Sequence, residues 1–340
     1  FWLKPFWRKS IFQHDSRAHN HRVLHPSSMS LGACADDSLA CDYLVTSANV
    51  EDLAFVDRLL AENQVWTVII VDTNAHPGGR WCHAPPFAKL DQPSAFYGVG
   101  SMPMDASKTM RRDEILQYCQ RIVEHFVQRG RVQYFPMTTF DGKNLCSIID
   151  SDIVKPVVIR RKVVRSSFSA PVQAARMFPF HVAAGTLVVP PKELPLVASG
   201  HAKYVVIGSG RSGMEAVVWL LKQGVCPEKL HWVVPEDMWL VSQSSMEPEN
   251  YVATARKFWA LFVESDTVEE FELGLEREGL RHRVDPTKRP TLFRGTTVTD
   301  AELVQLRRVI PNIIRKGLVR EVHTDRVVLE HGDVATGPDT

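Results

Sequence analysis

The stretch Tyr204-Val-Val-Ile-Gly-Ser-Gly-Arg-Ser-Gly213 decides the fold of this 340-residue chain. An apolar strand, Tyr204–Ile207, runs directly into a glycine-rich turn that opens a helix. A second apolar strand, Leu230–Val234, follows that helix. A GxGxxG pattern between a strand and a helix is typical of the pyrophosphate site in a dinucleotide-binding βαβ unit. The sequence therefore predicts a nucleotide-binding unit over Lys203–Pro235.

Each glycine of this turn has its own physical task. Gly208 permits the tight turn, Gly210 lets a pyrophosphate approach the backbone, and Gly213 lets the helix pack closely on the strand. The start of the helix adds free N–H groups and partial positive charge. We therefore expect NAD(P)H to bind along the whole turn, which comprises Gly208, Ser209, Gly210, Arg211, Ser212 and Gly213.

Two residues point to different nicotinamide cofactors. Glu236 lies just past the second strand, where an acid can accept hydrogen bonds from a ribose hydroxyl, which favours NAD. Arg211 could instead hold a 2′-phosphate, which favours NADP. The sequence leaves both cofactors open.

An earlier segment has the same frame but lacks the glycines. A strand at Tyr43–Thr46, a helix over 51–63 and a strand over 66–72 are expected from the apolar pattern. Alignment with the later unit places Ser47, Asn49 and Asp52 where the three glycines belong. Asp72 ends the second strand, where a ribose-binding acid belongs.

These replacements oppose a diphosphate ligand. Asp52, with Glu51 beside it, puts negative charge at the start of a helix, which suits the helix dipole but occupies the place of a pyrophosphate. Two like charges about 4 Å apart repel by roughly 1 kcal/mol in water and about 4 kcal/mol at an effective dielectric of 20. One interpretation is therefore that this unit keeps its fold and has lost its ligand.

The rest of the chain alternates between helical and strand patterns, which favours doubly wound α/β sheets. A helix is expected over Arg112–Gln128. Strands are expected at Val132–Phe135, Ser147–Ile149, Val157–Val164 and Thr186–Val189. Beyond the second unit we expect helices near Asn250–Val263, Thr267–Glu278 and Asp300–Val309, followed by a hairpin of Leu318–Val322 and Arg326–Leu329.

The composition narrows the function classes. A formal net charge of +1 offers no strong field for nucleic acid or an anionic membrane, and no apolar run is long enough to span a bilayer. The six cysteines form no Cys-x-x-Cys pair, which favours reduced thiols in the cytoplasm. We therefore expect a small-molecule substrate, with neither nucleic acid nor a membrane as a partner.

The first 40 residues lack steady periodicity, and we expect them to form a disordered leader in which Met29 is a possible start. The histidines of this segment have no fixed ligand spacing, so we expect no metal site there. They are His14, His19, His21 and His25.

Taken together, the two units and the turn Pro77-Gly78-Gly79-Arg80-Trp81 make the chain similar to FAD/NAD(P)-binding oxidoreductases of the flavin-containing monooxygenase-like group. The similarity covers about Asp42 to Asp339. It implies two Rossmann-like three-layer dinucleotide-binding domains, the second inserted in the first. The implied domains are an FAD-binding-like domain at 41–198, to which 316–340 return, and an NAD(P)-binding domain with a helical extension at 199–315.

The resemblance also implies FAD in the first unit and NAD(P)H in the second. Asp72 would bind the FAD ribose, and Gly78, Gly79 and Trp81 would lie along the FAD. Gln92, Pro93 and Ser94 would lie near the isoalloxazine. In such proteins the nicotinamide delivers hydride to the flavin, whose chemistry the protein orients and shields.

Two functions remain open from the sequence. The first is an FAD-dependent, NAD(P)H-oxidising oxidoreductase. The second is a non-catalytic or truncated relative that binds only NAD(P)H. The Phe-x-Gly with a following His and Trp that marks the monooxygenases is not matched by Phe178-Pro-Phe-His181. No catalytic residue is assigned.

Overall fold

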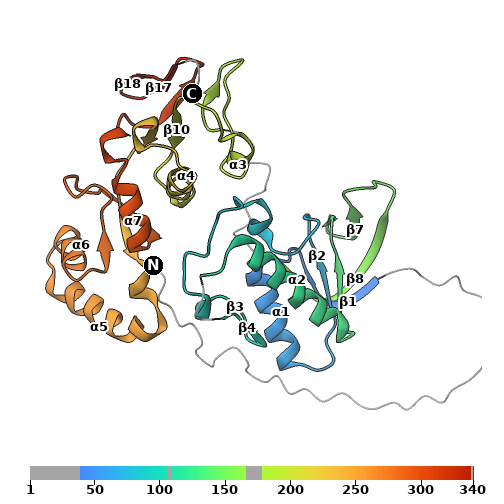
Figure 1. Ribbon diagram of the computed structural model, residues 1–340. Coiled ribbons are helices and arrows are strands. Elements are labelled where there is room, and N and C mark those ends of the chain that lie inside the picture. Colours follow the sequence, from blue (N-terminus) through green and yellow to red (C-terminus); the bar gives the residue numbers. More distant parts are fainter. Residues whose placement is uncertain (1–38, 106–108, 166–177, 338–339) are drawn as a thin grey trace, which may run out of the picture. The chain divides into compact units, whose positions relative to one another are not determined.

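The computed structural model describes residues 39–105, 109–165, 178–337 and 340 (Figure 1). The strands are β1 Leu39–Val45, β2 Val68–Val71, β3 Gly98–Val99, β4 Met102–Pro103, β5 Val132–Phe135, β6 Thr138–Phe140, β7 Asn144–Ser147, β8 Val154–Val164, β9 His181–Val182, β10 Tyr204–Ile207, β11 Leu230–Val233, β12 Met238–Ser242, β13 Arg281–His282, β14 Leu292–Val298, β15 Ile313–Ile314, β16 Val319–Val322, β17 Arg326–Leu329 and β18 Gly332–Ala335. The helices are α1 Val50–Glu62, α2 Arg112–Gln128, α3 Leu194–Val197, α4 Arg211–Lys222, α5 Pro248–Glu264, α6 Val268–Arg277 and α7 Asp300–Arg307.

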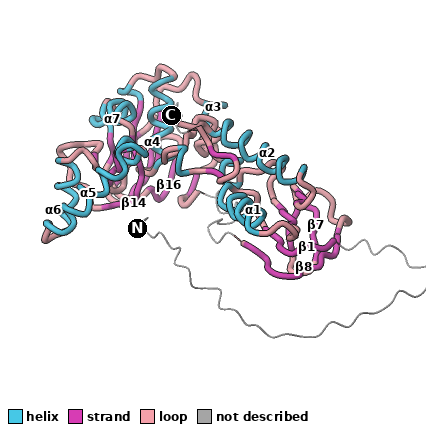
Figure 2. Tube along the Cα trace, turned by 90° about the horizontal axis from the view of Figure 1, so that it is seen from below, coloured by secondary structure: helices cyan, strands magenta, loops and turns pink. Residues whose placement is uncertain are grey.

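The first unit has three layers built on a sheet of order β5-β2-β1-β8-β7-β6. The four strands β5, β2, β1 and β8 run parallel, while β6, β7 and the start of β8 form an antiparallel meander. Helices α1 and α2 cover one face of the parallel strands, and Figures 1 and 2 both show α1 next to β1.

The strand residues of this unit alternate between its two faces, as the two-residue period of a strand requires. On β2, Val68 and Ile70 pack against the helices, whereas Ile69 and Val71 pack against the meander. All four side chains are buried, which explains why this strand is a continuous apolar run.

The second unit repeats this plan. Its parallel sheet has the order β10-β11-β15. Helices α4 and α7 share one hydrophobic cluster with β11. The other face of the sheet is covered by β16 and β17, whose side chains cluster with Val205, Ile207 and Val233.

This packing corrects the expected place of residues 316–340. The described part of this segment does not return to the first unit, because the meander β16–β17–β18 pairs with β9 and buries its apolar side chains against the second sheet. Between β11 and β15 the chain adds a small sheet of order β13-β12-β14 and the helices α5 and α6.

Other expectations stand as follows. The helix at Arg112–Gln128, the strands at Val132–Phe135 and Tyr204–Ile207, and the C-terminal hairpin are confirmed. The expected strand at Thr186–Val189 is wrong, since these residues form no regular element, and β7 ends at Ser147 rather than beginning there. Met29 and the four N-terminal histidines lie outside the described residues, and Leu39 and Ala40 already belong to β1.

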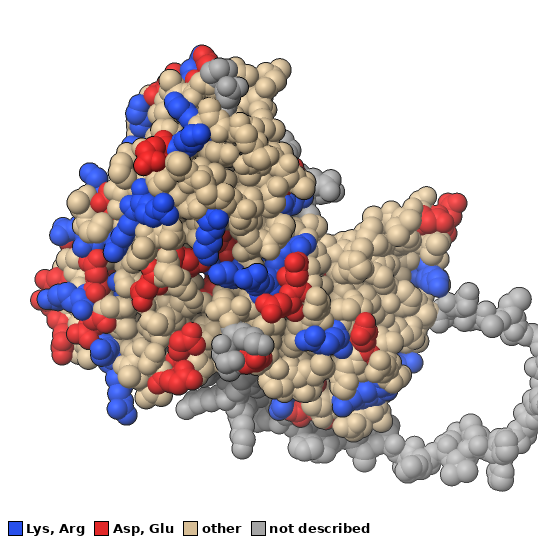
Figure 3. Space-filling view, viewed as in Figure 1, with Lys and Arg blue, Asp and Glu red and all other residues tan. Residues whose placement is uncertain are grey.

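The surface and the helices add two observations. Lys and Arg are interspersed with Asp and Glu over the face that Figure 3 presents.

Among the described residues, no helix combines the length and the apolar character needed to cross a bilayer.

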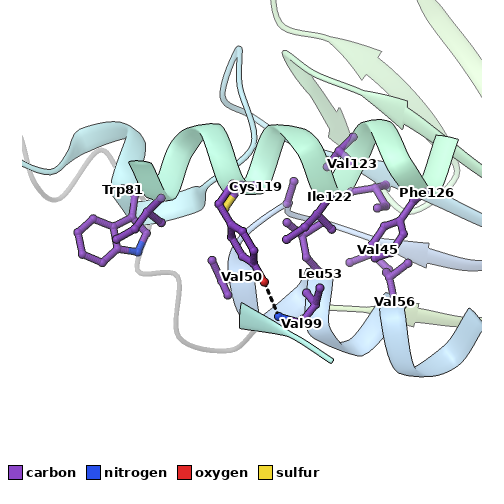
Figure 4. Packing of buried hydrophobic residues seen from close by; sticks show 14 of the residues in the cluster. Val45, Val50, Leu53, Val56, Trp81, Val99, Cys119, Ile122, Val123 and Phe126 are labelled. Carbon is purple, nitrogen blue, oxygen red and sulfur yellow. Dashed lines mark hydrogen bonds between the residues drawn. The ribbon is translucent and has the colours of Figure 1, made fainter. Parts of the chain in front are cut away.

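The core of the first unit gives a direct test of this packing. Phe126 of α2 is 1% exposed and packs within the cluster drawn in Figure 4, whereas its neighbour Val127 is 42% exposed. We expect Phe126→Ala to lower the free energy of unfolding by about 3–5 kcal/mol, because it removes a buried ring and leaves a cavity. Val127→Ala should change it by about 0.5 kcal/mol or less. Equal effects of the two substitutions in chemical denaturation would contradict the packing.

Candidate functional site

The turn between β10 and α4 has the backbone geometry of a pyrophosphate site. Gly208 has a φ of 111°, a conformation that side chains disfavour. A Cβ built on Gly213 would overlap the carbonyl oxygen of Gly208, so the helix can approach the strand this closely only through a glycine. The indole Nε1–H of Trp232 donates to the same carbonyl over 2.9 Å and fixes its direction.

Open space lies in front of this turn at Gly210. A Cβ built on Gly210 would meet no described atom within 4 Å. Gly210 is the N-cap of α4, and no side chain of the described residues caps its first N–H groups. Ser209 and Ser212 lie in the same turn, and Ser212 is exposed. The turn therefore presents unpaired N–H groups to an anion, which is what a diphosphate needs.

Glu236 lies exposed beyond the end of β11, where the sequence places a ribose-binding acid. Its neighbour Asp237 is engaged elsewhere, since Arg315 donates to its two oxygens over 2.7 and 3.0 Å. Of the two acids, Glu236 is thus the one that faces solvent.

Arg211 is the centre of an ion cluster. Its guanidinium donates to both oxygens of Glu302 over 3.0 and 3.2 Å, and its Nε lies 2.8 Å from Asp91 and 3.2 Å from Glu215. It also donates to the carbonyl of Thr297. We call Arg211 and these three acids the Arg211 cluster. The guanidinium that was expected to bind a 2′-phosphate is therefore already paired with carboxyl groups of the protein.

Asp91 connects this cluster to the preceding loop. Its carbonyl accepts hydrogen bonds from Gln243 over 3.2 Å and from Thr297 over 3.0 Å. Two residues earlier, the N–H of Lys89 donates to Glu215 over 3.2 Å. The i,i+4 spacing of Arg211 and Glu215 was visible in the sequence, but the partners Asp91 and Glu302 are distant along the chain and carried no local signal.

The two glutamates of the cluster titrate in opposite directions. Burial raises the pKa of Glu215 to about 7, although Arg211 opposes this rise. Burial also acts to raise the pKa of Glu302, but the charge and hydrogen bonds of Arg211 more than offset it and hold that pKa below its usual value. Glu302 is therefore the main counter-charge of Arg211.

The first turn is closed by its own side chains. Asn49 caps α1 by accepting from the N–H of Asp52 over 2.7 Å. The carboxylate of Asp52 is only 4% exposed and accepts a short hydrogen bond from the hydroxyl of Ser47. The three residues that replace the glycines thus satisfy the start of the helix internally, where the second turn leaves it open.

Asp72 is also committed to protein groups. It is 1% exposed, one oxygen accepts from the N–H of Ala48 over 2.8 Å, and the other accepts from the backbone and side chain of Asn74 over 2.8 and 2.9 Å. Burial raises its pKa, against the effect of these hydrogen bonds. A ribose hydroxyl that binds Asp72 would have to displace one of these hydrogen bonds.

The Gly78-Gly79 turn packs directly on the first turn. The N–H of Gly78 donates to the carbonyl of Ala48 over 2.8 Å, and a Cβ on Gly79 would collide with the side chain of Asn49. Trp81 is buried, and its indole N–H donates to the hydroxyl of Tyr97 over 2.8 Å. The structure therefore brings Gly78, Gly79 and Asp72 together around the closed turn.

The residues expected near an isoalloxazine lie on the loop that follows Asp91. Ser94 is buried at 1% exposure, Pro93 is buried, and Gln92 is half-buried and donates to the carbonyl of Phe96 over 3.4 Å.

Five cysteines fall within the described residues, and all are free thiols. The same residues contain no cluster of three metal-ligating side chains.

Comparisons with known proteins bear on the fold and on length. No family model matches the chain. Two uncharacterized proteins, from Mycobacterium tuberculosis and Mycobacterium bovis, are each 34% identical over 323 residues, which cover 88% of this chain and 59% of theirs. The chain thus spans 59% of the length of these curated relatives. Among solved structures, the open crystal structure of cyclohexanone monooxygenase matches with a TM-score of 0.51 and 17% identity, over 88% of this chain and 71% of that one.

The Arg211 cluster predicts a pH dependence of stability with a defined sign. Because the folded-state pKa of Glu215 lies near 7 and its unfolded value near 4.5, the folded state binds the extra proton between these values, so the free energy of unfolding falls as the pH rises through this window. Glu215→Gln removes this loss. We expect the variant to match the wild type at pH 4 and to be more stable by about 3 kcal/mol at pH 8.

Glu302→Gln is the matched control, since the pKa of Glu302 is lowered. Removing the carboxylate of Glu302 should lower the free energy of unfolding at pH 7, and should lower it less at pH 4. Denaturant titrations at both ends of the range compare the variants. Parallel pH profiles for the two would contradict the assignment of opposite roles.

Proposed function

We propose that this chain, which has a flavin monooxygenase-like fold, binds NAD(P)H at the turn between β10 and α4. The observation that carries the proposal is the contrast between the two βα turns. The space in front of Gly210 is open, whereas in the first unit Asn49 stands at that position against Gly79, and the carboxylate of Asp52 is buried beside the hydroxyl of Ser47. An open turn at a helix start favours a diphosphate, and a closed, acidic one disfavours it.

The residues of this chain would divide the binding between them. The N–H groups that open α4 would hold the pyrophosphate, and the exposed Glu236 would accept from a ribose hydroxyl. The engagement of Arg211 by Glu302 and Asp91 favours this ribose contact over a 2′-phosphate contact, and so favours NADH. The bound nicotinamide would supply a hydride.

FAD does not fit the first unit in the way that the resemblance implies. Asp52 buries a carboxylate at the start of α1, where its negative charge would oppose a pyrophosphate, and both oxygens of Asp72 already accept hydrogen bonds from the protein. The proposed nucleotide binding therefore does not depend on a flavin.

A second candidate function is an FAD-dependent oxidoreductase that oxidises NAD(P)H. Two observations favour this candidate: the fold of the chain, and the Gly78-Gly79-x-Trp81 turn, which packs on the turn before α1. It requires the first turn to open around the cofactor. The colour of the purified protein separates the two candidates, because a flavoprotein absorbs visible light.

Gly210→Asp tests the nucleotide site. The site has room for the new side chain, so the variant should fold, but its carboxylate would repel the diphosphate. We expect the affinity for NADH and NADPH to fall by about a hundredfold or more, which corresponds to about 3 kcal/mol. Quenching of protein fluorescence during nucleotide titration provides the measurement.

Asn49→Asp is the matched control, because it introduces the same residue at the equivalent position of the first turn and preserves the helix cap. It should leave nucleotide affinity unchanged. Wild-type affinity in Gly210→Asp would refute the site.

The first turn has its own test. We expect the purified wild-type chain to be colourless, and we expect the triple substitution of Ser47, Asn49 and Asp52 by glycine to raise FAD occupancy, because it removes the carboxylate and the side chains that fill the turn. Absorbance after incubation with FAD and gel filtration reports occupancy. Stoichiometric flavin in the wild-type protein would instead favour the second candidate.

A further inference from the structure

The Arg211 cluster contains more acidic groups than basic ones. One guanidinium faces three carboxyl groups, those of Asp91, Glu215 and Glu302. If all three were ionised, three negative charges against one positive charge would leave two of them uncompensated. Most of the cluster is shielded from water, since the side chains of Arg211 and Glu302 are 18% and 12% exposed. Uncompensated charge is costly in such a place, so this composition favours a bound proton.

Glu215 is the acid best placed to hold that proton. Its side chain is 8% exposed, whereas the side chain of Asp91 is 46% exposed and can share its charge with water. Glu302 accepts two hydrogen bonds from the guanidinium, over 3.0 and 3.2 Å, whereas Glu215 accepts one from its Nε over 3.2 Å. Glu302 is therefore the paired carboxylate, and burial raises the pKa of Glu215 to about 7.

Among the described residues, charged groups face Glu215 from α4, from the loop that precedes Gln92 and from α7. They are Arg211, Asp91 and Glu302. Lys89, on the same loop, presents its backbone N–H, which donates to Glu215 over 3.2 Å. Burial raises the pKa of Asp91 against the charges of Arg211 and Arg80. The surroundings of Glu215 thus add to its burial a second acid of raised pKa, and one guanidinium serves both.

Glu215 also lies close to the proposed nucleotide site. Gly210 is the N-cap of α4, and no side chain of the described residues caps the N–H groups that follow it. Glu215 comes five residues later on the same helix, which places it about 8 Å along the helix axis from Gly210. Charges at such a separation interact strongly through partly buried protein. A diphosphate on these N–H groups would therefore favour the protonated form of Glu215.

We propose that nucleotide binding at the turn between β10 and α4 is coupled to protonation of Glu215, so that the chain takes up a proton when it binds NADH. This inference rests on the proposed function and adds a regulation to the same site. By linkage, the proton and the nucleotide each strengthen the binding of the other by the same factor. Nucleotide affinity is therefore highest below neutral pH and falls as the pH rises through neutrality.

NADH titrations at pH 6 and pH 8 test the coupling. NADH is the probe because its diphosphate keeps its charge over this range, whereas the 2′-phosphate of NADPH titrates near its lower end. We expect the affinity of the wild-type chain to fall about fivefold from pH 6 to pH 8. Calorimetric titrations at pH 7.5, in buffers of different ionisation enthalpy, should show an uptake of about half a proton per NADH bound.

Glu215→Gln identifies the titrating group. The substitution keeps the size of the side chain and an acceptor for the N–H of Lys89, but it removes the carboxyl group. The variant should bind NADH equally well at pH 6 and pH 8, about fivefold more tightly than the wild type at pH 8, and without proton uptake.

Asp91→Asn is the matched control within the cluster. Besides burial, the charge of Asp91 raises the pKa of Glu215, so its removal should shift the pH dependence of NADH affinity to lower pH without abolishing it. A pH dependence that Glu215→Gln leaves unchanged, or that Asp91→Asn abolishes, would overturn the coupling and leave the nucleotide site in place. Absence of NADH binding at either pH would instead refute the proposed function, and the coupling with it.

Discussion

The second unit depends on one close contact, the approach of α4 to β10 through Gly213 and the carbonyl of Gly208. A side chain at Gly213 would push the helix away from the strand, and the start of α4 would no longer point its N–H groups into the open turn. Trp232 holds the same carbonyl from the neighbouring strand β11. Packing and ligand geometry are therefore set by the same atoms, which is why a glycine pattern can predict both the fold and the site.

The first unit has the same architecture without the glycine contact between helix and strand. Asn49 caps its helix, Asp52 turns inward, and Asp72 binds the backbone of the turn rather than leaving its oxygens to a ribose. These contacts stabilise the turn on its own, as caps and charge at a helix start generally do. The unit therefore keeps its three layers without needing an anion at the turn.

The sequence predicted those parts of the fold that local patterns determine. Arg112–Gln128 has a clear helical period, and Tyr204–Ile207 leads into a glycine turn, so both elements were found with their ends. Thr186–Val189 has strand-like residues but finds no partner strand, because pairing depends on distant chain. The sequence predicts the meander as a hairpin and places it in the wrong unit. A two-residue period shows that one face of a strand is buried, but it does not show which part of the protein that face packs against. The Arg211 cluster was missed for the same reason, because Asp91 and Glu302 are brought to Arg211 only by the folded chain.

That cluster has a consequence for how the protein should respond to its solvent. Within the turn itself, one guanidinium faces three carboxyl groups, and once the pH exceeds the raised pKa of Glu215, near 7, their combined charge is negative beside a site suited to a doubly negative ligand. Mobile ions screen such a repulsion over roughly 8–10 Å at physiological ionic strength. Added salt should therefore strengthen dinucleotide binding here, whereas in most anion sites, where the protein supplies a net positive field, it weakens it.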